Sequence, residues 1–285
     1  MGKRVVFCFL SLWLAGNTGR AADRDSLVVL FWNVENFFEP SGERGWTKKR
    51  FYAKCNAIAS TVLAAADVFG RVPDVLAFCE VGNRAVLGAL TGSTLLRKMD
   101  YRIVHYDSPD RRGIDCALLY RASSLSLRAS SPRHIFADDG TVLPTRDILL
   151  AEFPQADILV NHHPSKLGGA SGDRRAVAMA RMRFLCDSLR SCGHPAQFCI
   201  GDFNDDVWKA GGEGTIKYNG SWEKIDGHFS FGSLEVRERV FRPAFLTEKD
   251  KAFGGWKPRR TFVGPSWHGG VSDHYPVICE ISFAN

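Results

Sequence analysis

Apolar runs in this sequence repeatedly end in acidic, amide or imidazole side chains, the groups that bind metal ions and transfer protons. The run CIGDFNDD ends with Asp202 and Asn204, and the run LFWNVENFF carries Asn33 and Glu35. In both pairs the residues are two apart, so they lie on the same side of an extended chain. Like charges gathered over so few residues cost stability unless something cationic offsets them. The two runs therefore predict a site that holds a cation.

Three more apolar runs, from distant parts of the chain, carry the same kinds of group at one end. Glu80 ends one run, Asn161, His162 and His163 end another, and Asp273 and His274 come just before the last run. If the five edges meet, they form a carboxylate-rich pocket with imidazoles beside it. Oxygen ligands of this kind suit Mg²⁺, with Mn²⁺ or Ca²⁺ as alternatives, rather than zinc.

Each of these groups also has an ordinary structural interpretation. Asp and Asn after a strand usually mark a turn. Glu80 could begin a helix, where a carboxylate favours the helix dipole. A single histidine such as His162 or His163 is more often a satisfied core or surface residue than a catalyst. The prediction of a site therefore depends on the whole set of residues.

Short apolar and β-branched segments that end in polar or glycine-containing turns predict a sheet-rich fold. The expected strands are residues 26–34, 74–81, 101–106, 114–121, 147–153, 157–163, 196–203 and 275–283. Helical spacing predicts helices over 48–70 and 173–193, with a shorter one over 82–90. The segments expected to be loops are 106–113, 130–147 and 207–221. Without an internal repeat or a Pro/Ser linker, residues 26–285 are expected to form one domain.

Residues 1–21 are expected to be a secretory signal peptide. A basic start, MGKR, precedes an apolar stretch too short to span a bilayer comfortably, and Gly19 and Ala21 suit a cleavage box. An uncleaved membrane anchor is the less favoured interpretation. The leader predicts a secreted or periplasmic protein with no transmembrane segment after cleavage. Its loss removes Lys3, Arg4 and Arg20 and lowers the formal charge from +6 to +3, too weak a bias to argue for nucleic acid alone.

Cysteine usage does not predict a disulfide framework. Four cysteines lie in apolar strand-like runs, where cysteine behaves as a small hydrophobe. These are Cys79, Cys116, Cys199 and Cys279. Cys186 and Cys192 are close in sequence, but a bridge between them is not favoured, and the lack of a CxxC motif gives no support to a zinc site.

Seven blocks of the sequence resemble the motifs of the endonuclease/exonuclease/phosphatase superfamily, which includes the DNase I and exonuclease III types of metal-dependent phosphoesterase. In chain order the blocks are FWNVENFF, PDVLAFCEVGNR, RRGIDCALLYR, VNHHPSK, GDFND, KIDGHFSFGSL and GGVSDHYPV. They occur in the family's order over residues 28–283. The resemblance implies an α/β (α+β) fold: a DNase I-like, four-layer sandwich of two mixed β-sheets flanked by helices, with the site at one end.

The resemblance also implies which residues hold the metal. Glu80 is the implied main ligand, with Asn33 and Glu35 nearby, and Asp273 would help to position metal or water. The metal supplies the charge neutralisation that phosphodiester hydrolysis needs on the phosphoryl oxygens.

The catalytic roles follow from the resemblance in the same way. Asp202 would orient and deprotonate the attacking water, and Asn204 would hold that water or the phosphate. His274 would contact a non-bridging phosphate oxygen and stabilise the transition state. Asp226 would orient this histidine.

Other residues are implied to contact substrate. The family's second histidine lies in an H-x-x-S pattern, which selects His162 with Ser165 rather than His163. Arg112 could contact a substrate phosphate, or it could be an ordinary surface arginine. Three aromatic residues before the SDH block could line a substrate groove or pack a loop: Trp256, Phe262 and Trp267.

The leading hypothesis for function is an exported, Mg²⁺-dependent phosphodiesterase, a nuclease acting on DNA or RNA. A phospholipid (sphingomyelinase-like) or small-molecule phosphoesterase of the same fold is the alternative, and the lack of a long apolar hairpin counts against the lipid version. A non-catalytic binding module is disfavoured because all the expected catalytic positions are present. The expected partner is nucleic acid or another phosphodiester substrate, and no stable protein partner is implied.

Overall fold

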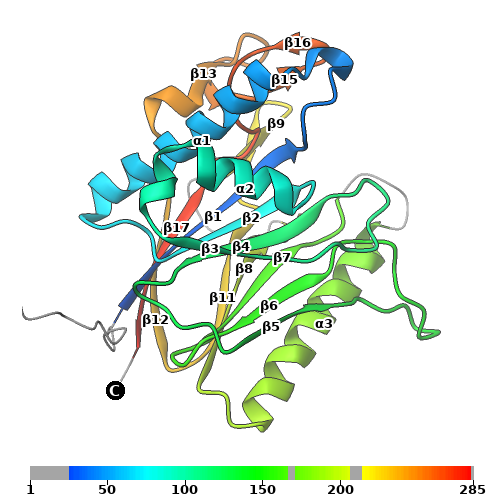
Figure 1. Cartoon of the computed structure of the whole chain (residues 1–285). Coiled ribbons are helices and arrows are strands. Elements are labelled where there is room, and N and C mark those ends of the chain that lie inside the picture. The colour runs from blue at the N-terminus through cyan, green and yellow to red at the C-terminus, as the bar shows by residue number, and fades with distance from the viewer. Residues whose placement is uncertain (1–25, 166–170, 206–213, 284–285) are drawn as a thin grey trace, which may run out of the picture.

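The computed structural model describes residues 26–165, 171–205 and 214–283 (Figure 1). The predicted signal peptide at 1–21 and Asp206 lie outside these ranges. Within them, two β-sheets pack face to face, and helices cover the outer face of each sheet (Figure 1). The predicted four-layer α/β sandwich is therefore confirmed.

The larger sheet has six strands among the described residues, in the order β12-β17-β1-β2-β4-β3. The strands are β1 (Ser26–Phe37), β2 (Val75–Val81), β3 (Tyr101–His105), β4 (Asp115–Arg121), β12 (Leu234–Val240) and β17 (Val277–Phe283). β1 runs parallel to β2, and the other neighbours in this sheet pair antiparallel. The sheet is thus mixed, and the carboxyl ends of β1 and β2 lie at the same edge.

The second sheet has five described strands in the order β11-β8-β7-β6-β5. The strands are β5 (Ala129–Arg133), β6 (Ile148–Glu152), β7 (Asp157–His162), β8 (Ala196–Asp202) and β11 (Asp226–Gly232). β7 runs parallel to β8, and the other pairs are antiparallel. Each sheet therefore has one parallel pair whose strands end side by side.

The strand sequences explain this layering. Residues that alternate along β1 face two different cores: Leu27, Val29 and Phe31 pack between the sheets, whereas Leu30 and Trp32 pack under the helices. A strand buried on both faces needs a continuous apolar run, which is what SLVVLFW provides.

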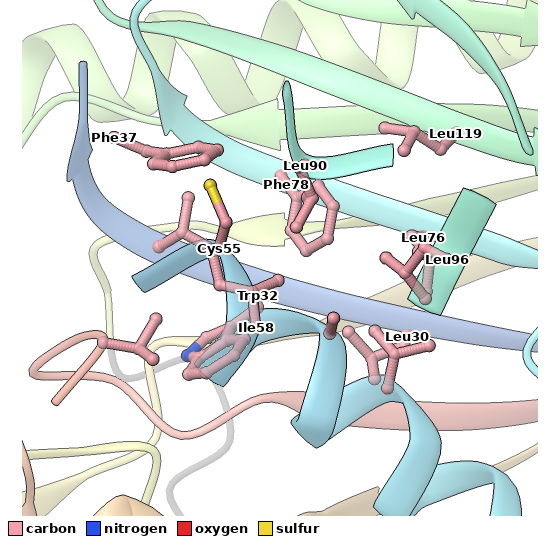
Figure 2. Packing of buried hydrophobic residues seen from close by; sticks show 14 of the residues in the cluster. Leu30, Trp32, Phe37, Cys55, Ile58, Leu76, Phe78, Leu90, Leu96 and Leu119 are labelled. Atoms are coloured by element: carbon pink, nitrogen blue, oxygen red, sulfur yellow. The ribbon is translucent and has the colours of Figure 1, made fainter. Parts of the chain in front are cut away.

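Three helices cover the sandwich among the described residues: α1 (Lys48–Phe69) and α2 (Arg84–Ser93) on the six-stranded sheet, and α3 (Ser171–Ser191) on the five-stranded sheet. The Thr47 side chain accepts a hydrogen bond from Arg50 N at the start of α1, and Gly70 ends that helix in the left-handed conformation that glycine adopts at low cost. Figure 2 shows Ile58 of α1 and Leu90 of α2 packing with Trp32, Phe78 and other apolar side chains of the sheet.

Short elements lie in the connections between strands of the same sheet. The hairpins are β9 (Ile216–Tyr218) with β10 (Ser221–Glu223), β13 (Thr247–Lys249) with β14 (Trp256–Pro258), and β15 (Phe262–Val263) with β16 (Ser266–Trp267). The 3₁₀ turns are η1 (Glu43–Gly45), η2 (Leu95–Lys98) and η3 (Ala244–Leu246). Phe262 and Trp267 pack against Trp46, so these two aromatics stabilise a loop, whereas Trp256 is exposed.

The eight predicted strands and three predicted helices are all present, with bounds that differ by a few residues. Two predicted loops are partly wrong. Residues 130–147 include most of β5 and a bridge between Phe136 and Val142, and residues 207–221 include β9, while 206–213 lie outside the described residues. β5 carries two serines and a proline, a composition that weakens any sequence signal for a strand, but an edge strand tolerates proline.

All seven cysteines in the described part of the chain are free. Cys186 lies beside Cys199, with the two sulfurs 3.3 Å apart, and Cys192 is exposed. The four cysteines expected to act as small hydrophobes are buried. Across the described residues, the helices are too short or too polar to span a bilayer.

Candidate active site

The two parallel strand pairs bring four of the predicted site residues to one end of the sandwich. Asn33 pairs with Cys79 in the β1–β2 register, next to Glu80, and His162 pairs with Asp202 in the β7–β8 register. Asn33 Nδ2 donates to Asp202 Oδ2 at 3.0 Å and lies 3.5 Å from Glu80 Oε1. A hydrogen bond from Asn33 therefore joins the two sheets at the site.

Close approach of β7 and β8 depends on Gly201. A Cβ at this position would lie 2.3 Å from the backbone oxygen of Asn161, a distance that no side chain could occupy without moving the strands. The glycine next to Asp202 thus allows Asp202 to reach its neighbours in β7.

Backbone strain is concentrated at the same end. Glu35, Asn36, Glu80 and Asn204 all have positive φ, at 46°, 49°, 61° and 50°. Register shifts in the β1–β2 and β2–β4 pairs accompany them. Left-handed conformations of non-glycine residues cost about 1–3 kcal/mol each and persist only where the surroundings hold them. Here they turn polar side chains out of the strand ladder and toward one another.

Asp202 is buried and lies between two histidines. Its Oδ2 is 3.7 Å from His162 Nε2 and 3.9 Å from His274 Nε2, and its Oδ1 accepts from Asn204 N at 2.9 Å. Burial, reinforced by the charge of Asp226, raises the pKa of Asp202 to about 7. A carboxyl with this pKa exchanges protons near neutral pH, as a general base must.

His274 is held by a buried carboxylate. Its Nδ1 lies 2.8 Å from Asp226 Oδ2, and its backbone oxygen accepts from Trp32 Nε1 at 2.8 Å. Burial acts to lower the pKa of His274, but the carboxylates of Asp226 and Asp202 outweigh it and raise that pKa well above its ordinary value. His274 is therefore a fixed imidazolium that directs Nε2 at Asp202.

His162 differs from His274 in charge. Burial, together with the nearby Arg146 cation, lowers the pKa of His162 well below its ordinary value, so this histidine is neutral. Arg146 donates from Nε to the His162 backbone oxygen at 3.1 Å and pairs with Asp110 at 3.2 Å, which holds the end of β7 in place.

Three carboxylates gather on the other side of Asp202. Glu80 Oε2 accepts from Asn36 N at 2.9 Å, and Asp273 Oδ2 lies 3.2 Å from Arg260 Nη2. Glu35 also pairs with Arg260. The charges of all three carboxylates raise the pKa of Arg260, although burial acts to lower it. The three carboxylates therefore lie close enough to Arg260 for each of them to stabilise its positive charge.

These donors fit a hard divalent cation. Glu80 and Asp273 offer partly exposed carboxylate oxygens, and the oxygen-rich set matches the preference of Mg²⁺ and Mn²⁺. Among the described residues, the groups whose N, O or S atoms cluster most closely here both include Asp202: one with Asp226 and His274, the other with Cys79 and His162. In the first, Asp226 is already committed to orienting His274.

Comparison with known proteins is decisive about the family. Residues 32–212 and 207–282 match the family model described as Endonuclease/Exonuclease/phosphatase family. The chain belongs to this family. The match confirms the predicted resemblance and makes the protein a member of a group of phosphoesterases, enzymes that typically depend on a divalent metal. A search of curated proteins finds no match.

Solved structures show the same fold at low sequence identity. A family protein from Bacteroides thetaiotaomicron has 16% identity and a TM-score of 0.58, with 91% of this chain and 98% of that chain covered. ANGEL2, a 2′,3′-cyclic phosphatase, has 13% identity and a TM-score of 0.60, with 93% and 97% covered. TDP2 from D. rerio, solved with a single-strand DNA product, has 13% identity and a TM-score of 0.57, with 91% and 100% covered.

The structure brings most of the predicted site residues of this family member together. Ser165 and Arg112 have weaker contacts. Ser165 is described at the end of the segment after β7, where its backbone oxygen accepts from Arg175 Nη1 at 3.3 Å. Arg112 is about half exposed and lies 3.5 Å from Glu80 Oε2. His163 turns away from the site, packs its ring 5.0 Å from that of Phe203, and has a pKa lowered to about 3 by burial.

Sequence reasoning missed three cations of the site: Arg146, Arg260 and Lys54. Lys54 is 1% exposed, and its Nζ donates to the Glu35 backbone oxygen at 2.5 Å. A signal for Lys54 was present, because it lies three residues after Phe51 and four before Ile58, on the apolar stripe of a predicted helix. The arginines lie in loops with no comparable pattern.

Proposed function

We propose that this protein is an exported, Mg²⁺-dependent phosphodiesterase that acts on nucleic acid. One observation carries the catalytic part of this proposal: a buried Asp202 with a pKa near 7 lies between the Nε2 atoms of His162 and His274. This arrangement suits the activation of a water molecule next to a phosphoryl group.

The proposed metal residues are Glu80, Asn33 and Asp273. When bound, Mg²⁺ supplies positive charge next to the phosphoryl oxygens. The side chains of Glu80 and Asp273 are 13% and 27% exposed, so an ion from solvent can reach both carboxylates.

The protein's own residues supply the proton chemistry. Asp202 accepts a proton from water as the water oxygen attacks phosphorus, the bond from phosphorus to the leaving oxygen breaks, and the leaving oxygen takes a proton from solvent. Asn204 helps to hold this loop through its donation to the His163 backbone oxygen at 2.9 Å. His274, kept cationic by Asp226, donates to a non-bridging oxygen whose charge grows in the transition state. His162 lies with Nε2 3.7 Å from Asp202 Oδ2, and because burial lowers its pKa it adds no positive charge beside Asp202.

Two observations favour a nucleic acid substrate. Arg112 and Arg260 place exposed guanidinium groups beside the carboxylates, and guanidinium matches phosphate in geometry. The D. rerio TDP2 structure of the same fold contains a single-strand DNA product.

Export is proposed from the basic and apolar leader at residues 1–21. Expression of the full chain in a bacterium with an intact export system should yield a protein that has lost the leader. Recovery of only the full-length chain from the cytosol would contradict export, without bearing on catalysis.

Hydrolysis is tested by incubating the purified protein with single-stranded DNA, RNA, sphingomyelin and bis(p-nitrophenyl) phosphate, each with Mg²⁺ and with EDTA. We expect EDTA-sensitive cleavage of nucleic acid and of the aryl diester, and none by the Asp202→Asn variant. Cleavage of sphingomyelin alone would replace the nuclease by the lipid enzyme, and no metal-dependent cleavage of any substrate would remove the proposed activity.

A further inference from the structure

We propose that Arg260 is a substrate-phosphate contact of this site, and that Glu35 positions Arg260 instead of binding the metal. The inference deepens the proposed function and rests on it for the identity of the substrate. It also changes the role that the sequence assigns to Glu35.

Glu35 already accepts hydrogen bonds from two cationic side chains of the protein. Arg260 donates to Glu35 Oε1 from Nε at 2.8 Å and also from Nη2. The buried Lys54 ammonium donates to the backbone oxygen of the same residue. Charge-assisted hydrogen bonds from guanidinium to carboxylate are among the strongest in proteins, and they hold both groups in one orientation.

A divalent ion at Glu35 would lie next to these cations. Two nitrogens of Arg260 donate to Glu35 Oε1, whereas Asp273 has a single contact with Arg260 at 3.2 Å and Glu80 a single contact with Arg112 at 3.5 Å, so an incoming ion would have to displace more at Glu35 than at the other two carboxylates. Glu80 and Asp273 are more open to an incoming ion, because their side chains are 13% and 27% exposed.

Glu35 does not occupy the other edge of the Arg260 guanidinium. Its side chain is 43% exposed, and no described residue accepts a hydrogen bond from Nη1. Its Nη2 lies 3.2 Å from Asp273 Oδ2, while the other oxygen of Asp273 lies 3.8 Å from His274 Nε2. Arg260 and His274 therefore flank a single carboxylate, and one phosphate group can reach both.

Glu35 and Arg260 are 225 residues apart, so the contact is a product of the fold. With Glu35 holding Nε and Nη2, the guanidinium loses little further freedom when it binds an anion. This preorganisation distinguishes Arg260 from Arg112, whose Nη2 alone makes the contacts, to Asn36 Oδ1 at 3.1 Å and to Glu80 Oε2 at 3.5 Å.

The first test compares Arg260→Gln with Arg259→Gln, an exposed neighbouring arginine whose Nε donates to the His268 backbone oxygen at 2.9 Å. We expect Arg260→Gln to raise KM for bis(p-nitrophenyl) phosphate and the inhibition constant of inorganic phosphate about tenfold or more. The Arg259→Gln variant should behave as wild type, and Arg260→Lys should recover part of the loss because it keeps charge but not the fork. Unchanged phosphate inhibition in a folded Arg260→Gln protein would overturn the substrate contact.

The second test measures Mg²⁺ binding by calorimetry, which does not depend on turnover. Glu35→Gln should bind Mg²⁺ within about threefold of wild type and weaken phosphate binding as Arg260→Gln does, whereas Glu80→Gln should weaken Mg²⁺ binding by about tenfold or more. Equal loss of Mg²⁺ binding in Glu35→Gln and Glu80→Gln would make Glu35 a metal ligand and overturn its positioning role. A wild-type protein that binds Mg²⁺ and phosphate but cleaves nothing would instead contradict the proposed function alone.

Discussion

The two halves of the site pair their carboxylates with different kinds of cation. In the fixed-charge half, Glu35 and Glu80 lie with Arg260, Lys54 and Arg112. In the proton-transfer half, the carboxylates are Asp202 and Asp226 and the cationic or neutral partners are His162 and His274. Asp273 lies between the halves, because one of its oxygens faces Arg260 and the other faces His274.

This difference separates two tasks within a few ångströms. Guanidinium stays charged at any pH of interest, so the fixed-charge half can hold anions and balance a metal site without changing its protonation. Imidazole and a carboxyl of raised pKa gain and lose protons near neutrality, which catalysis requires. Variants in the two halves should therefore fail in different ways.

The largest effect is expected in the proton-transfer half. Asp202→Asn and His274→Ala should each lower kcat by about 10³-fold, within the range of a positioned general acid or base, at any Mg²⁺ concentration. The exposed neighbour Asp205 offers a matched control, and Asp205→Asn should leave kcat unchanged. Steady-state rates on the aryl diester test this, with circular dichroism to confirm folding. Near-normal turnover in folded Asp202→Asn protein would remove Asp202 from the base role.

Loss of Glu80 should behave differently, because a metal site can be refilled by mass action. Glu80→Gln should lower the rate by about 10²-fold at limiting Mg²⁺, and a large part of the activity should return as Mg²⁺ is raised. Rates measured across a Mg²⁺ series for this variant and for Asp202→Asn give the comparison. A Glu80→Gln rate that stays low at every Mg²⁺ concentration would mean that Glu80 does more than bind metal.

A smaller loss is expected when the partner of His274 is altered. Asp226→Asn removes the charge that raises the pKa of His274, so this pKa should fall, and kcat should fall on the order of tenfold. The histidine is titrated by NMR in the wild type and the variant. An unchanged titration of His274 would show that Asp226 does not control its protonation.

The smallest expected effect is on stability. Asp202→Asn, which loses activity, should be more stable than the wild type at high pH. The pKa of Asp202 is about 7 in the folded protein and 3.8 as an ordinary carboxyl, so the folded state binds the proton more tightly. The free energy of unfolding of the wild type should therefore fall as pH rises from about 4 to about 7. The free energy of unfolding of Asp202→Asn should lack this decrease, because the variant has no carboxyl to titrate at this position.

In EDTA, Asp202→Asn should melt above wild type by about 2–6 °C at pH 8, and this gap should shrink at pH 5. Thermal unfolding at the two pH values measures the gap. Equal melting temperatures at pH 8 would mean that burial of Asp202 costs the fold nothing.

Much of the fold could be predicted from local pattern. The strands of the central sheets are short apolar runs, and burial on both faces makes such runs continuous and easy to find. β12 was missed although LEVRERV alternates between partly buried and exposed residues, a period-two signal that its charged residues conceal. β11 contains glycine, histidine and serine, and it is a strand because it pairs with β8 along its whole length.

The residues of the proton-transfer half could be named from motifs, because Asp202 and Asn204 lie at the end of a recognisable strand and His274 comes just before another. Their pKa values could not, since these depend on burial and on which charges lie nearby. His162 and His163 illustrate this point: the H-x-x-S pattern selects His162, but it does not predict the burial that lowers the pKa of both histidines. The two are adjacent in sequence, yet one faces Asp202 and the other packs against Phe203.

The sequence by itself determined eight strands and three helices of the described residues, and which acidic, amide and imidazole groups lie at the ends of those strands. Only the tertiary structure decided which acceptor each cation of the site meets: Glu35 for Arg260, Asp110 for Arg146, and the backbone oxygen of Glu35 for Lys54. The physical reason is that periodicity and residue type act over a few neighbouring residues, whereas these ion pairs join segments that come together only when two sheets and their loops pack.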